Sequence, residues 1–172
     1  FGLCSFALSY LLLYYATLYS SAAMVTLIFL FLLMVTPLLI GRVFKTPISP
    51  RVYVGGVFGI VGVAVIVLPN LHALSHSFLI GLGLAVAGTL VTAVGDTLSY
   101  YNNQHHVEPI AANSIGMLTA LLVLAALTFT MGKPLHLPAS VHYWAGLLYL
   151  ALLGSFAAWL MYVYLIRSIG VV

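Results

Sequence analysis

Asp96 is the only acidic residue inside an expected membrane span of this sequence. Thr92 and Ser99 lie one helical turn before and after it, and Thr89 and Asn103 fall on the same side of a helix. A charged aspartate at the bilayer centre costs about 2.5–3.5 kcal/mol, so its presence needs a reason. One interpretation is a carboxyl that lines a cavity or couples proton movement. The other places Asp96 about 8 Å from the end of its span, within reach of water or a helix dipole.

Two short motifs resemble the sites of intramembrane enzymes, but each lacks a catalytic partner. Ala93-Val-Gly-Asp96 resembles the GxGD motif of membrane aspartyl proteases, yet Ala93 replaces its first glycine and no second aspartate exists for the required pair. Gly154-Ser155 resembles a serine nucleophile site, yet the order Gly-Ser-Phe-Ala departs from G-x-S-x-G. No histidine lies inside an expected span to activate Ser155. We therefore expect no enzymatic activity.

The histidines fall in or beside the expected loops. Four lie on one side of the membrane and two on the other: His72, His76, His136 and His142, then His105 and His106. Four imidazoles on one face could bind a transition metal. Their irregular spacing favours ordinary polar loop residues, so neither a metal nor another cofactor is predicted. The sequence also has no nucleotide-binding loop, which leaves ATP-driven chemistry unsupported.

The composition indicates a protein that folds in a bilayer. Hydrophobic residues make up 64% of the 172 residues and charged residues 4%, and the mean hydropathy is +1.22. A soluble domain carries roughly 25% charged residues, so this surface would aggregate in water. The net charge of +3 rests on five cations, too few to indicate a nucleic-acid-binding patch. The single cysteine, Cys4, excludes a disulfide framework.

Six stretches are long enough to cross the bilayer. Backbone groups in lipid must bond within the chain, so such stretches become helices of roughly 17–25 residues. Pro37 is expected to kink the second helix near Leu33. The sequence thus predicts an all-α, polytopic membrane protein. Its expected spans are Phe1–Leu18, Ser21–Ile40, Val52–Leu68, Phe78–Tyr101, Pro109–Met131 and Tyr143–Ile166.

The cations set the expected orientation. Four of them follow the second and sixth spans, which end on the same side of the membrane: Arg42, Lys45, Arg51 and Arg167. Only Lys133 falls on the opposite side. The positive-inside rule makes the richer side cytoplasmic, so the first span runs outward. Tyr143 and Trp144 then lie at the outer interface, where aromatic residues are enriched.

Small residues recur at helix-packing spacing in two of the expected spans. The third span has a GxxxG pair at Gly55 and Gly59. In the fourth span, alternate steps of four and three keep six residues on one face: Gly81, Ala85, Gly88, Thr92, Gly95 and Ser99. Membrane helices associate through small residues that let their backbones approach closely. We therefore expect both stripes to pack against neighbouring helices.

Aromatic residues enrich the first and last spans. Tyr10 and Tyr14 stack at positions i and i+4, and Trp159 and Tyr162 lie in the sixth span. Such residues more often anchor a helix in a core or at the membrane surface. An amphipathic cavity wall would also need them.

The order of several motifs resembles the EamA-type repeat of the drug/metabolite transporter superfamily. The resemblance runs along essentially the whole chain. The segments that carry it are Tyr15-Ala-Thr-Leu-Tyr-Ser-Ser-Ala22, Val35-Thr-Pro-Leu38, Gly55-Gly56 with Gly59-Ile-Val-Gly-Val63, Gly88 to Tyr100, Pro109-Ile-Ala-Ala-Asn113 with Gly116-Met117, Leu147-Leu-Tyr-Leu150, Gly154-Ser155, and Leu165-Ile-Arg-Ser-Ile-Gly170.

That resemblance implies two five-helix repeats of opposite topology. The six spans would be the third to eighth of ten helices, so the chain would be a fragment. Residues 1–69 would form the last three helices of the first repeat and residues 70–172 the first three of the second. The sequence departs from the family in two places. The loop Gly41–Thr46 lacks the acid that the family often carries, and Asp96 stands where the family commonly has asparagine.

The family points to a secondary transporter of a bacterial inner membrane that exports metabolites, amino acids or amphipathic compounds. The substrate would bind between the repeats, with alternating access by rocking of one bundle against the other. The alternative is a membrane scaffold or assembly subunit without transport. The expected partners are a small-molecule substrate and lipid, with no nucleic acid, and a homodimer stays open. The candidate cavity residues are Tyr10, Tyr14, Asp96, Asn113, Trp159 and Tyr162.

Overall fold

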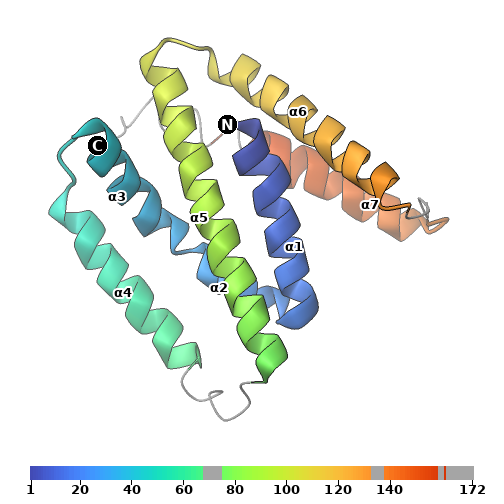
Figure 1. Ribbon diagram of the computed structural model, residues 1–172, viewed down its shortest axis with the longest axis horizontal. Coiled ribbons are helices and arrows are strands. Elements are labelled where there is room, and N and C mark those ends of the chain that lie inside the picture. The colour runs from blue at the N-terminus through green and yellow to red at the C-terminus, as the bar shows by residue number, and fades with distance from the viewer. Residues whose placement is uncertain (68–74, 133–137, 159–160, 162–172) are drawn as a thin grey trace. The chain divides into compact units, whose positions relative to one another are not determined.

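The computed structural model describes residues 1–67, 75–132, 138–158 and 161. All regular structure in these residues is helical. The chain forms two compact units, Phe1–Ala125 and the residues from Ala126 onward. The first unit contains nearly all of the helices discussed below (Figure 1).

The first unit is an up-and-down helix bundle. Its chain starts in a π-helical segment, η1, which continues directly into α1. The second unit begins within α6, the last helix of this bundle. The bounds are η1 Leu3–Leu8, α1 Ser9–Tyr19, α2 Ala22–Phe29, α3 Leu32–Phe44, α4 Pro50–Val67, α5 His76–Gln104 and α6 Pro109–Thr130.

Serine side chains cap two of these helices. The Ser21 hydroxyl accepts a hydrogen bond from the Met24 amide at 3.2 Å, and the Ser75 hydroxyl accepts one from the Phe78 amide at 3.2 Å. Both caps satisfy an amide that has no partner within the helix. The cap at Ser75 explains why α5 begins at His76, two residues before the expected start of its span.

The second expected span is broken into α2 and α3. At Leu30 and Phe31 the backbone turns by i→i+3 hydrogen bonds, for example from the Phe31 amide to the Ile28 carbonyl at 3.0 Å. Pro37 stays inside α3. The distortion therefore precedes the expected position near Leu33. The tighter turn gives the amides of this segment partners without an α-helical ladder.

The predicted all-α class is confirmed, while membrane-spanning length is found for three of the six expected spans. Helices of sufficient length and apolar character cover Ala22–Phe44, His76–Gln104 and Pro109–Thr130 in the described part of the chain. The helices at α1, α4 and the start of the sixth span are apolar but shorter. Large apolar side chains lie exposed on several helices, including Leu33, Phe58 and Phe129. A surface of this kind suits lipid rather than water, and these features indicate a multi-pass membrane protein.

The core of the first unit consists of two small clusters. One joins α1, α2 and α5 through Ala16, Met24, Val25, Ile28 and Ala85. The other joins η1 to α6 through Phe6, Ala7 and Ala120. In Figure 1, α5 runs between α1 and α3, and α4 lies beyond α3 at the edge of this unit. Helix α5 is thus the central element of the bundle.

The second unit contains α7, Val141–Tyr149, followed by the π-helical segment η3, Leu150–Ala157. At its start, the Trp144 indole Nε1 donates a hydrogen bond to the Pro138 carbonyl at 3.0 Å. The Tyr143 ring lies edge-on to Trp144, with ring centres 5.7 Å apart. Residues 162–166 of the sixth expected span lie outside the described residues.

Candidate functional site

The small residues of α5 let η1 and α1 approach closely. A Cβ atom added at Gly81 would lie 2.9 Å from the Ser20 Cβ, and one at Gly88 would lie 2.9 Å from the Leu13 Cγ. At Gly95 an added Cβ would overlap the Ser5 hydroxyl and lie 2.9 Å from the Ser5 amide nitrogen. A side chain at any of these positions would force the two helices apart. Because the face with these glycines packs against η1 and α1, a different face of α5 packs against its other neighbour, α3.

A second close approach joins η1 to α6. An added Cβ at Gly116 would lie 3.1 Å from the Phe1 ring and 3.2 Å from the Gly2 Cα. The segment η1 is therefore held between α5 and α6. These contacts lie entirely within Phe1–Ala125.

Asp96 lies on α5 where that helix packs against α3. The Thr36 hydroxyl donates a hydrogen bond to the Asp96 Oδ2 at 3.3 Å, and both residues are half-buried. The bond is longer than the usual ~2.7–2.8 Å for hydroxyl donors and therefore weak. Because α5 continues to Gln104, Asp96 lies eight residues, or about 12 Å, before the helix end. The helix therefore continues beyond Tyr101, the expected end of this span.

The two threonines of the expected polar stripe bind within their own helix. The hydroxyls of Thr89 and Thr92 donate to the carbonyls of Ala85 and Gly88, at 2.8 Å and 2.9 Å. Both side chains are buried. These hydrogen bonds satisfy the two buried hydroxyl groups, and neither threonine donates a hydrogen bond to Asp96. The partner of Asp96 on α3, Thr36, was missed in the sequence, although a hydroxyl next to Pro37 in an apolar helix is a usable signal.

Tyr10 and Tyr14 belong to an aromatic row along η1 and α1. Ring centres are 5.4 Å apart for Phe1 and Phe6, 6.3 Å for Phe6 and Tyr10, and 6.3 Å for Tyr10 and Tyr14. Tyr14 is 69% exposed and Tyr10 is 43% exposed. The row therefore runs from the core at Phe6 to the surface of the bundle at Tyr10 and Tyr14.

Asn113 is buried on α6, and its Nδ2 lies 3.8 Å from the Met117 sulfur. Its Oδ1 has no hydrogen-bond partner among the residues that the structure describes. Trp159 and Tyr162, the remaining candidate cavity residues, lie outside the described residues. Among the described candidates, Tyr10 and Tyr14 are in ring contact with each other, and no hydrogen bond or ring contact joins Asp96, Asn113 and this tyrosine pair.

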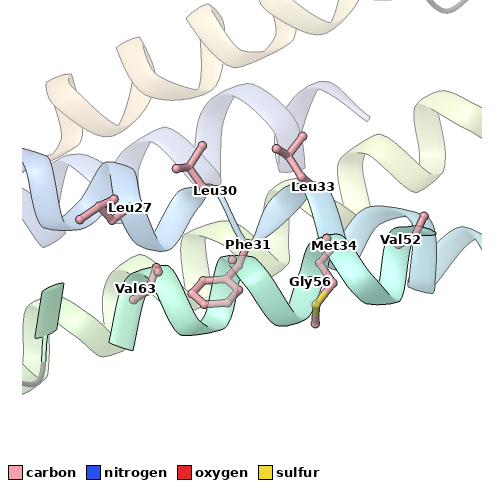
Figure 2. A pocket seen from close by; sticks show the side chains of 11 residues that line it. Leu27, Leu30, Phe31, Leu33, Met34, Val52, Gly56 and Val63 are labelled. Carbon is pink, nitrogen blue, oxygen red and sulfur yellow. The ribbon is translucent and has the colours of Figure 1, made fainter. Parts of the chain in front are cut away.

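An apolar groove lies between α4 and the break that separates α2 from α3 (Figure 2). Its volume is about 470 Å³. Figure 2 shows its labelled side chains coming from α2, α3 and their junction on one side and from α4 on the other. The lining residues are Leu27, Leu30, Phe31, Leu33, Met34, Val52, Gly55, Gly56, Gly59, Gly62 and Val63.

The glycines of α4 differ from those of α5. Only Gly56 is covered in this groove, because the Met34 side chain lies directly against it. An added Cβ at Gly55 or Gly59 would meet no atom within 4 Å. The expected packing of this GxxxG pair against a helix is thus not seen in the described residues. The pair forms part of the open floor of the groove.

Metal-binding residues do not gather in the described part of the chain, where no group of three histidine, cysteine or acidic side chains could hold an ion. No protein-family model, curated protein or solved structure matches the chain. The conclusion about function consequently depends on the fold and on the environment of Asp96.

Proposed function

We propose that this chain is part of a secondary membrane transporter that exports small metabolites, amino acids or amphipathic compounds by alternating access. The observation that carries the proposal is the Asp96 carboxyl, which lies within a membrane-length helix and accepts a hydrogen bond from Thr36 on another helix. Ionisable residues inside membrane helices typically mark substrate or ion pathways.

The surroundings of Asp96 are suited to a region of a transporter that switches between two conformations. Thr36 lies on α3, between the break at Leu30–Phe31 and the helix-interior Pro37. Broken membrane helices form the binding sites of many secondary transporters. A weak bond between α5 and a distorted helix can open when the carboxyl gains a proton or meets a substrate. The proposal therefore assigns proton coupling to Asp96.

The resemblance to EamA-type transporters supplies the frame of the proposal. It places the chain in a bacterial inner membrane, with residues 1–69 and 70–172 in two inverted repeats and a substrate site between them. Tyr10, Tyr14, Asn113, Trp159 and Tyr162 remain proposed cavity residues. Coupling through Asp96 would be peculiar to this protein, because the family commonly has asparagine there. We propose no enzymatic activity.

A membrane scaffold without transport is the alternative function. The open glycine floor at Gly55 and Gly59 favours it, because such a surface can accept a helix of another subunit. A homodimer would be one such assembly.

Counterflow in liposomes distinguishes the two functions. The full-length protein is reconstituted, loaded with a high concentration of one unlabelled compound, and diluted into a trace of the labelled form. The probes are neutral amino acids and the cationic dye ethidium. The proposal predicts saturable, protein-dependent accumulation of at least one probe. If no probe in the panel shows saturable flux, the scaffold function replaces transport.

A further inference from the structure

The groove beside α4 has the size and chemistry of a binding site for an apolar chain. Its volume of about 470 Å³ falls within the ~300–1,000 Å³ that is usual for ligand sites. Every lining residue is apolar or glycine. Leu30 and Leu33 remain more than half exposed, so the groove opens on the surface of the bundle.

The length of the groove matches one leaflet of the bilayer. On α4 it extends from Val52 to Val63, eleven residues or about 16 Å along the helix axis. The hydrocarbon core of a bilayer is about 30 Å thick, so one leaflet is roughly half of that. The groove thus covers the depth of the acyl chains on one side of the membrane.

Positive charge gathers at one end of the groove. Arg51 directly precedes the lining residue Val52, and Arg42 and Lys45 end α3 on the same side of the connecting turn. All three side chains are exposed, and the sequence has no acid before Asp96. This end is the one that the positive-inside rule makes cytoplasmic. Anionic lipids are concentrated in that leaflet.

We propose that this groove binds an acyl chain of an anionic phospholipid, with the lipid phosphate at Arg51 and the neighbouring cations. The walls supply apolar contact for the chain, and Gly55 and Gly59 leave room for it against the α4 backbone. A second copy of this protein fits the surface less well. In a two-fold dimer about the membrane normal, Arg42, Lys45 and Arg51 would face the same cations of the partner.

Lipid binding is measured by native mass spectrometry of the purified full-length protein. Palmitoyl-oleoyl phosphatidylglycerol is titrated in parallel with phosphatidylcholine carrying the same chains. Gly59→Leu places a side chain in the groove, its Cβ would meet no atom within 4 Å, and leucine favours a helix more than glycine does. Gly83→Leu is the matched control, because Gly83 on α5 is also exposed with no atom within 4 Å of an added Cβ. Arg51→Gln tests the headgroup.

The proposal predicts preferential binding of phosphatidylglycerol to the wild type and to Gly83→Leu. Gly59→Leu should lose about tenfold or more in affinity. Arg51→Gln should weaken phosphatidylglycerol binding about fivefold and phosphatidylcholine binding less, because the choline ammonium offsets the phosphate charge. Equal binding of the two lipids to the wild type overturns the proposal, and so does unchanged binding by Gly59→Leu. A dimer that Gly59→Leu converts to monomers, with lipid binding intact, assigns the groove to a second copy instead.

Discussion

At the scale of single residues, Asp96 has one side-chain hydrogen bond among the described residues, and that bond crosses between helices. The threonines around it donate to carbonyls of their own helix, so Thr36 on α3 supplies the only described hydroxyl partner. A side-chain hydrogen bond in a membrane protein contributes about 0.6 kcal/mol on average. That small value suits a contact that forms and opens during a transport cycle.

A double-mutant cycle of Thr36→Val and Asp96→Ala tests this contact. We expect a coupling energy of about 0.6 kcal/mol, measured from unfolding of the purified protein by increasing SDS in mixed micelles. Thr26→Val combined with Asp96→Ala is the control pair. The Thr26 hydroxyl donates to its own-helix Ala22 carbonyl, so these two changes should be additive. Equal coupling in both pairs would show that Thr36 has no special relation to Asp96.

The glycines of α5 make a second residue-scale prediction. Gly95→Val places a branched side chain against Ser5, and overpacking of this kind costs about 1–3 kcal/mol. We expect a lower midpoint of thermal unfolding in detergent. The midpoint is measured by size-exclusion chromatography of heated samples. Gly83→Val should leave the midpoint nearly unchanged, because its surroundings are open. A similar loss in both variants would contradict the close approach of α5 and η1.

The residues that matter could be recognised from the sequence more readily than their partners. Asp96 is one of two acids in 172 residues, and the step of four and three marks Gly81, Gly88 and Gly95 as one face. The spacing of small residues identifies a packing face of a helix, but it does not identify the helix that packs against that face. The contact of α5 with α1, and the hydrogen bond from Thr36, depend on three-dimensional packing between segments far apart in the chain.

At the scale of elements, the break between α2 and α3 is the main irregularity of the bundle. It divides a stretch that has the length to cross the membrane, and it supplies Leu30 and Phe31 to the wall of the groove. The proline that predicts a distortion stands six residues after Phe31, inside α3. A proline indicates only approximately where the hydrogen bonds of a helix are weakened, because nearby amides can form i→i+3 hydrogen bonds instead.

Replacing Pro37 by alanine tests whether the distorted helix is needed for movement. Alanine restores an amide that can bond the Leu33 carbonyl, and it favours a helix by up to about 3 kcal/mol relative to proline. We expect a higher thermal midpoint and slower counterflow than in the wild type. Pro47→Ala is the control, because Pro47 lies exposed in the turn before α4 and outside any helix. Faster flux, or a lower midpoint in Pro37→Ala alone, would contradict this role.

At the scale of the whole molecule, hydropathy predicted apolar helical structure at all six expected positions, of which three have membrane-spanning length in the described part of the chain. Apolar runs of this length have no stable alternative in lipid, which is why this level of structure is readable from the sequence. The packing of the Gly55 and Gly59 face was not predictable in the same way. A stripe of small residues can pack against a helix, contact a lipid chain or line an open groove. Only the structure distinguishes these three arrangements.

The expected orientation can be checked with single cysteines in a background where Cys4 is replaced by serine. A membrane-impermeant maleimide is added to intact cells that express the full-length protein. His76→Cys, at the start of α5, should react, and Val107→Cys, in the turn before α6, should react only after permeabilisation. The α5 helix separates these exposed sites. The reverse pattern would invert the orientation, and the groove would then face the opposite leaflet.

We propose that Asp96 couples secondary transport to proton movement. The most direct test is accumulation driven by a pH gradient across proteoliposomes, using the probe with the largest counterflow. The account predicts that the wild type accumulates this probe against its gradient. Asp96→Asn should retain counterflow but lose at least about tenfold of the gradient-driven accumulation, because an amide cannot carry a proton through the cycle. Equal gradient-driven accumulation by the wild type and Asp96→Asn would contradict the claim.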